Sequence, residues 1–151
     1  SLMVEPLCRS SILWDATKNK NKIMNTFTFI YILVIHYIAD FVLQTHEEAM
    51  GKSVSNKWLL QHTSKYSGVW FSAAMLFIVV NSLITGYACD IKYVMYFWLI
   101  TFVSHTITDY FTSRWAKKYF SVQDYHNGFL VVGFDQILHY LQLWFTFKLL
   151  L

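Results

Sequence analysis

The sequence predicts an all-α integral membrane protein, a four-helix bundle, and three observations support this fold class. Apolar residues make up 56% of the 151 residues and charged residues only 14%, against about a quarter charged in soluble domains. The mean hydropathy is +0.37. Four long apolar runs follow one another, each near the ~20 residues that a helix needs to cross a bilayer. We therefore expect four spans joined by short links.

The first 23 residues differ from the rest of the chain. They are polar, and their apolar patch at residues 7–13 is too short and too polar for the core of a signal peptide. Met24 looks like a natural start directly ahead of the first apolar run. We expect residues 1–23 to form a peripheral or disordered extension and residues 24–151 to form the four-span domain.

The four expected spans cover residues 26–44, 58–84, 93–112 and 127–149. The links between them are short, so consecutive helices should pack antiparallel. Tryptophan and tyrosine lie near the ends of the runs, as in the aromatic belts of membrane proteins. Links one and three share a side and carry most of the basic residues that follow Met24, which predicts that they face the cytoplasm.

The first span carries a polar stripe. His36, Asp40 and Gln44 follow at steps of four, and residues four apart share one face of an α-helix. A central Asp in a membrane helix costs roughly 2.5–3.5 kcal/mol on insertion scales. Such a residue usually faces the interior of a bundle, so the other spans should supply partners.

The same pairing of His with Asp recurs on two more spans. The second span adds His62, and at ~1.5 Å per residue the polar positions of all four spans overlap in depth. We expect the groups to converge in the half of the bundle near links one and three. The three pairs are His36 with Asp40, His105 with Asp109, and Asp135 with His139.

Imidazole nitrogens and carboxylate oxygens are ligands for Zn²⁺ and other divalent metals. Two such pairs on facing helices could supply four ligands. The predicted metal ligands are His36, Asp40, His105, Asp109, Asp135 and His139.

Two histidines are also catalytic candidates. His36 could be a ligand or a general base, and His62 could donate a proton at the water-facing rim. A lone His or Asp in a span often only joins helices by hydrogen bonds. For the whole matched set we favour a metal or catalytic site.

Three motifs resemble the signatures of an uncharacterised family of small polytopic membrane proteins of phages and bacteria, classed as a domain of unknown function. They begin at His36, Ser104 and Phe134, reading His-Tyr-Ile-Ala-Asp-Phe-Val-Leu-Gln, Ser-His-Thr-Ile-Thr-Asp-Tyr-Phe and Phe-Asp-Gln-Ile-Leu-His. The resemblance covers about residues 25–148 and implies four spans and a bacterial inner membrane. The His-x-x-x-Asp pattern is also similar, more loosely, to bacterial inner-membrane proteins described as metal-dependent hydrolases.

The first functional hypothesis is a metal-dependent hydrolase acting on a lipid or another amphiphile that enters from the bilayer. A proton or metal-ion conduit is an alternative, but conduits carry polar groups through the whole membrane depth, and here the far half is apolar. A non-enzymatic module that binds a host membrane protein also stays open. No basic block is long enough to follow a nucleic acid backbone, so we expect no nucleic acid partner.

Overall fold

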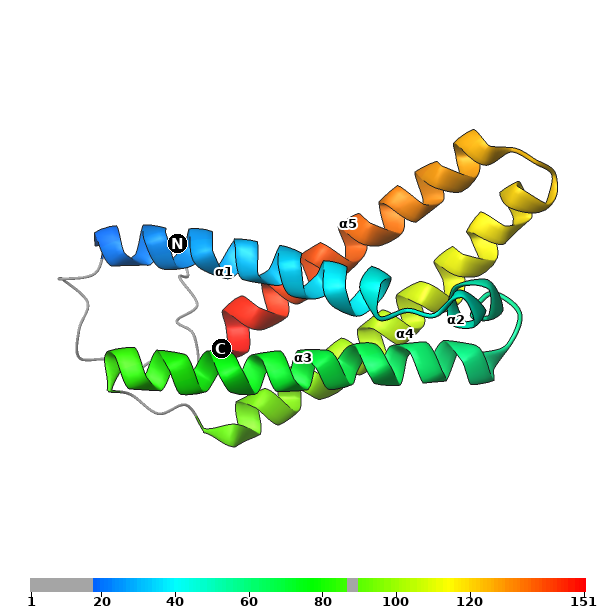
Figure 1. Cartoon of the computed structure of the whole chain (residues 1–151). Coiled ribbons are helices and arrows are strands. Elements are labelled where there is room, and N and C mark those ends of the chain that lie inside the picture. Colours follow the sequence, from blue (N-terminus) through cyan, green and yellow to red (C-terminus); the bar gives the residue numbers. More distant parts are fainter. Residues whose placement is uncertain (1–17, 87–89) are drawn as a thin grey trace.

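A computed structural model describes residues 18–86 and 90–151, and within them the chain is all-α (Figure 1). The all-α prediction is therefore confirmed. Helix α1 begins at Lys18, inside the expected extension, whose first 17 residues lie outside the described part. The elements in order are α1 Lys18–Tyr37, the π-helical turn η1 Ile38–Val42, α2 His46–Gly51, α3 Asn56–Thr85, α4 Ile91–Ser121 and α5 Tyr125–Leu150.

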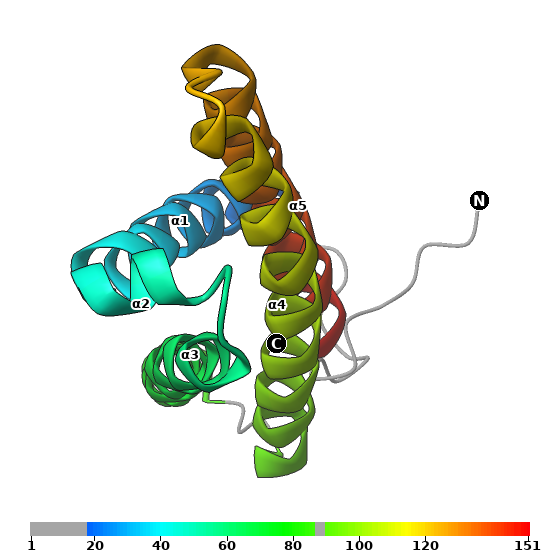
Figure 2. The same cartoon turned by 90° about the vertical axis from the view of Figure 1, so that its right-hand side faces the viewer.

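The four long helices alternate in direction, as the short links predict. Helices α1 and α3 lie on one side of the hairpin formed by α4 and α5, which crosses them obliquely (Figures 1 and 2). Helix α5 packs along α4, α4 packs against α3, and α1 contacts α5. The short helix α2 lies at the end of the molecule where α3 begins (Figure 1).

Helix α4 is longer than the expected third span. It continues past residue 112 to Ser121, so the third link is reduced to residues 122–124. The extra turns contain Ala116, Lys117 and Lys118, which are good helix formers. Hydropathy marks where a helix becomes polar, not where its backbone hydrogen bonds stop.

Helix α2 lies in the first link, where the sequence reading expected no helix. Its N-terminus is a capping box: Glu48 N–H donates to Thr45 Oγ1 at 3.3 Å, and Thr45 N–H donates to the Glu48 carboxylate at 2.8 Å. The pattern Thr-x-x-Glu is a known signature of a helix start. The sequence therefore contained a signal for this helix.

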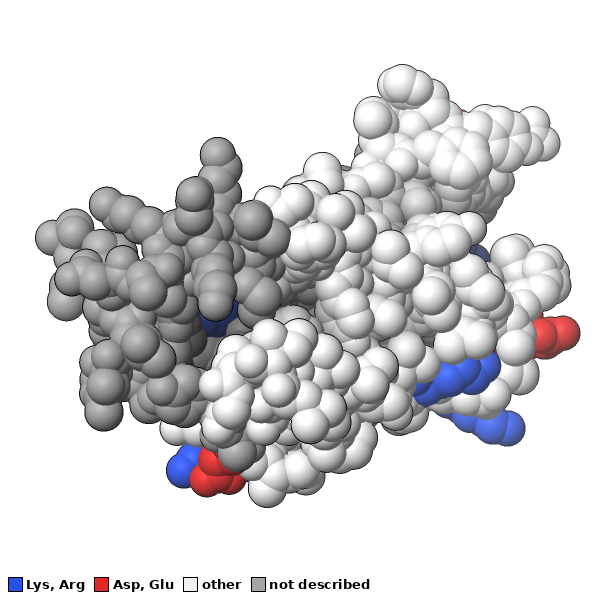
Figure 3. Space-filling view, turned by 60° about the vertical axis from the view of Figure 1, so that its left-hand side comes forward, with Lys and Arg blue, Asp and Glu red and all other residues white. Residues whose placement is uncertain are grey.

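The core divides into an apolar half and a polar half. The apolar half joins the end of α3 to the start of α4 and the end of α5, and it includes Trp70, Phe97, Leu143 and Phe147. The other half buries His, Asp and Thr side chains. The described part of the face in Figure 3 shows few charged side chains.

Among the described helices, α3 is long and apolar enough to cross a membrane, and the stretch Thr26–Val42 is a shorter apolar helix. The expectation of four spans is therefore not confirmed. Buried His and Asp side chains lower the hydropathy of α4 and α5, and two half-buried glutamines lower that of α5 further.

Candidate metal centre

The π-helical turn places the first carboxylate. Leu43 N–H donates to the carbonyl of Ile38 at 2.9 Å, five residues back, and Asp40 lies inside the turn with 2% of its surface exposed. His36 precedes it on the same face, with its Nε2 3.7 Å from Asp40 Oδ2. Single π-helical turns occur within α-helices, and they are frequently found at functional sites.

Asp40 meets one side chain from α3 and two from α4. His62 Nε2 lies 3.0 Å from Asp40 Oδ1 and 3.3 Å from Asp109 Oδ2. His105 Nε2 lies 3.6 Å from each of these oxygens and 3.2 Å from His62 Nε2. All four residues are buried, and each offers one ligand atom within 4.8 Å of the others.

These separations match the edges of a small tetrahedron. Ligands 2.0–2.2 Å from a tetrahedral zinc ion lie about 3.3–3.6 Å from one another. Five of the six separations among the two imidazole nitrogens and the two carboxylate oxygens run from 3.0 to 3.6 Å. Two nitrogens and two oxygens are a donor set that suits zinc or a similar divalent ion.

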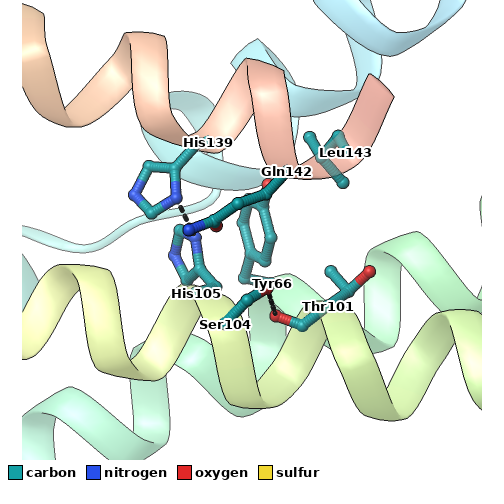
Figure 4. Close-up of a pocket in the computed structure, with 7 residues that line it drawn as sticks. All are labelled: Tyr66, Thr101, Ser104, His105, His139, Gln142 and Leu143. Atoms are coloured by element: carbon teal, nitrogen blue, oxygen red, sulfur yellow. Dashed lines mark hydrogen bonds between the residues drawn. The ribbon is translucent and has the colours of Figure 1, made fainter. Parts of the chain in front are cut away.

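A second group shares Asp40 and adds Asp135 and His139 from α5. His139 Nε2 lies 3.2 Å from Asp109 Oδ1 and 3.3 Å from Asp135 Oδ1. Its Nδ1 lies 3.1 Å from Nδ1 of His105, as Figure 4 shows from the α4–α5 side. The two groups therefore form one continuous centre.

His36 stands beside these two groups and belongs to neither. Its Nδ1 lies 2.8 Å from the hydroxyl of Tyr66, and its Nε2 lies 2.8 Å from Gln136 Oε1. The Gln136 amide donates to Asp40 and to Asp135, each at 3.1 Å. Tyr66 also stacks on His105, with ring centroids 3.7 Å apart and planes 5° apart.

Sequence reasoning missed Tyr66, although it lies one helical turn after His62 on α3. It also missed Lys52, which was treated only as a basic residue of the first link. The Lys52 ammonium lies 2.9 Å from Asp109 Oδ2. Burial by itself would lower the pKa of Lys52, but the carboxylates of Asp109 and Asp40 outweigh burial and raise it.

The seven predicted residues all converge, but two differ from the prediction. His36, a predicted ligand, lies outside both ligand groups. His62 was expected at the water-facing rim, but it is fully buried between the two carboxylates. The Gln44 amide, 3.2 Å from His62 Nδ1, and Lys52 lie on this side of the centre. The two remaining histidines, His46 and His126, are exposed.

A family model described as "Protein of unknown function (DUF3307)" matches residues 28–150. The chain belongs to this family. The match contains every residue of the centre, from His36 to His139. Comparison with curated proteins and with solved structures finds no match.

Proposed function

We propose that this DUF3307 chain is a membrane-embedded, metal-dependent hydrolase that acts on a lipid or another amphiphile. The observation that carries the proposal is the spacing of Asp40, His62, His105 and Asp109. Four buried ligand atoms at these separations fit a zinc-sized divalent ion. Such an ion would also offset the charge of carboxylates that are costly to bury alone.

The distribution of side chains supports a membrane location. Large apolar side chains are exposed along the long helices, for example Leu83 at 81%, Phe111 at 66% and Phe129 at 66%. The buried side chains of the bundle include histidines and aspartates. Ionisable residues inside membrane proteins face the bundle interior in this way.

The chemistry divides among the residues of the centre. A divalent ion with an open position lowers the pKa of a bound water to about 7. Because four tetrahedral protein ligands would leave no position for water, three of Asp40, His62, His105 and Asp109 would hold the ion and water would take the fourth position. His36 is the candidate general base, because it lies outside both ligand groups and its ring is fixed by Tyr66 and Gln136.

A purely structural role, in which the polar network joins the helices, is the second candidate function, and one observation favours it. The groups of the centre already bond one another, since both nitrogens of His36 and both carboxylate oxygens of Asp109 have partners. Networks of this kind can join helices without any metal. A measurement of bound metal separates the two candidates.

The test is metal analysis of the full chain purified in a neutral detergent. We expect about one divalent ion per chain, lost from Asp109→Ala because that substitution removes a ligand. His126→Ala is the matched control, since this exposed histidine lies outside the centre. Absence of metal from the wild type, or the same metal content per chain in the Asp109→Ala variant, would favour the purely structural role.

A further inference from the structure

We propose that a cavity beside the centre binds the phosphate head of an anionic amphiphile, and that Lys52 is its anion contact. The inference rests on the proposed function, because it requires the centre to hold its metal. It names the substrate class that the centre would take. The argument uses the shape, the lining and the charge of the cavity.

The cavity is lined by residues of η1, α2, α4 and α5 and of the segments that flank α2. Its volume is about 160 Å³. A water molecule occupies about 30 Å³ in the liquid, so the cavity has room for a group several times larger than water. Asp40 and Asp135 form part of its wall, which places a bound group directly against the centre.

The lining of the cavity is amphipathic. Polar groups come from Gln44, Lys52, Thr112, Ser113 and Gln136, and apolar walls come from Phe41, Ala116, Val131 and Val132. Phe41 is 46% exposed, so the apolar wall continues to the outer surface. A ligand with a polar head and an apolar chain matches this lining.

Ser113 offers an unused hydrogen-bonding group in this lining. Its Oγ is buried and has no hydrogen-bond partner among the described residues. A buried hydroxyl without a partner costs free energy, commonly about 1–3 kcal/mol. Rotation of the side chain would be needed to bring this hydroxyl to a phosphate oxygen in the cavity.

The charges around the cavity indicate which kind of head group it would bind. The centre contains three carboxylates, Asp40, Asp109 and Asp135, which one divalent ion and the Lys52 ammonium would balance. Lys52 is bonded to Asp109 Oδ2, an oxygen in the tetrahedral set. A divalent ion on that oxygen would repel the ammonium. The ammonium would then lose this hydrogen bond, and because it lines the cavity it could pair with an anionic group there.

A phosphate head provides that partner. Its oxygens can pair with Lys52 and accept a hydrogen bond from the amide of Gln44. A cationic head would have to compete with the ion and with Lys52 for the carboxylates of Asp40 and Asp135. With neutral histidines, the ion and Lys52 would balance the three carboxylates, so the phosphate would meet no net negative charge on entry.

The test is calorimetric titration of the zinc-loaded full chain, in neutral detergent, with n-hexyl phosphate. We expect wild type and Lys52→Arg to bind it and Lys52→Gln to bind at least about tenfold more weakly. The Lys52→Gln variant should keep its zinc. Lys57→Gln is the matched control, because Lys57 is exposed at the same end and does not line the cavity.

Inorganic phosphate is the second arm of the titration. It should bind more weakly than hexyl phosphate, because it leaves the apolar wall uncovered. Equal binding of the two would overturn the assignment to an amphiphile. Equal binding of hexyl phosphate by wild type and Lys52→Gln, or no binding by a zinc-loaded wild type, would overturn this inference alone. A wild type that holds no metal would overturn the proposed function as well.

Discussion

At the scale of single residues, Tyr66 fixes two histidines of the centre at once. Its hydroxyl lies 2.8 Å from His36 Nδ1, and its ring stacks on His105 at 3.7 Å. Tyr66 is 1% exposed, so its hydroxyl has no ready access to water. The hydroxyl and the ring therefore contribute separately to the arrangement.

Replacing Tyr66 by Phe separates these contributions, since Phe keeps the stacked ring and removes the hydroxyl. We expect the free energy of unfolding to fall by about 1–3 kcal/mol, because a buried nitrogen of His36 loses its partner. Thermal unfolding in detergent measures the change. Tyr96→Phe is the control, because Tyr96 is 54% exposed. Equal losses in the two variants would contradict the role assigned to the Tyr66 hydroxyl.

At the scale of elements, the corner between α2 and α3 depends on a glycine. A Cβ added to Gly51 would lie 2.5 Å from Cγ of Trp58 and 2.9 Å from its Cβ. These atoms are at the base of the side chain, which cannot swing away without moving the helix. Gly51 precedes Lys52, so the same corner also positions the ammonium at the centre.

Two glycine substitutions test this corner. Gly51→Ala should lower the free energy of unfolding by about 1–3 kcal/mol, because it overpacks the corner. Gly68→Ala is the matched control within α3, since nothing lies within 4 Å of a Cβ added there. Alanine should stabilise the helix at that position by about 0.5–1 kcal/mol. Thermal midpoints that move equally in both variants would contradict the close packing at Gly51.

The stability of the fold should depend on pH through the Glu48 carboxylate of helix α2. Burial would raise the pKa of this carboxyl, but hydrogen bonds from Lys65, at 2.8 Å, and from the Thr45 N–H outweigh burial and lower it. Because the pKa is lower in the folded chain, the carboxylate stabilises the fold above its unfolded pKa of about 4.3. That contribution is lost as the pH falls through the folded pKa.

The measurement compares the wild type with Glu48→Gln. The difference between their thermal midpoints should be largest near pH 6 and should shrink as the pH is lowered. Other carboxylates titrate in both proteins, so their effect cancels in the difference. A difference that is constant with pH would contradict the role of the Glu48 charge.

At the scale of the whole molecule, the first and third links lie at the same end. The start of α3 and the turn between α4 and α5 both lie on the right of Figure 1. The chain reaches the other end between α3 and α4. A membrane-embedded chain with this fold should therefore present Ser55 and Ser121 on one side and Asp90 on the other.

Cysteine labelling in vesicles tests this orientation. Single cysteines at Ser55, Ser121 and Asp90 would be introduced into a chain with Cys8 and Cys89 replaced by serine. We expect an impermeant reagent to label the first two from the same side, and the positive-inside rule predicts the cytoplasmic side. Asp90 should be labelled from the opposite side. Labelling of Ser55 and Ser121 from opposite sides would contradict the membrane arrangement.

The sequence by itself determined the helical class and the residues that meet in the polar half. Apolar runs require helices, and the i, i+4 spacing places His36 near Asp40 and His105 near Asp109, whatever the rest of the chain does. The family match to residues 28–150 agrees with the resemblance over residues 25–148. These features are local, so a single sequence contains them.

Only the tertiary structure decided which polar side chains of different helices contact one another. The contact of His62 with Asp40 and the ion pair between Lys52 and Asp109 join residues 22 and 57 positions apart in the chain. Periodicity reports which face of a helix is polar, but not which neighbour that face meets. Packing of the α4–α5 hairpin against α3 and η1 brought the ligand atoms to metal-binding distances and left the cavity beside them.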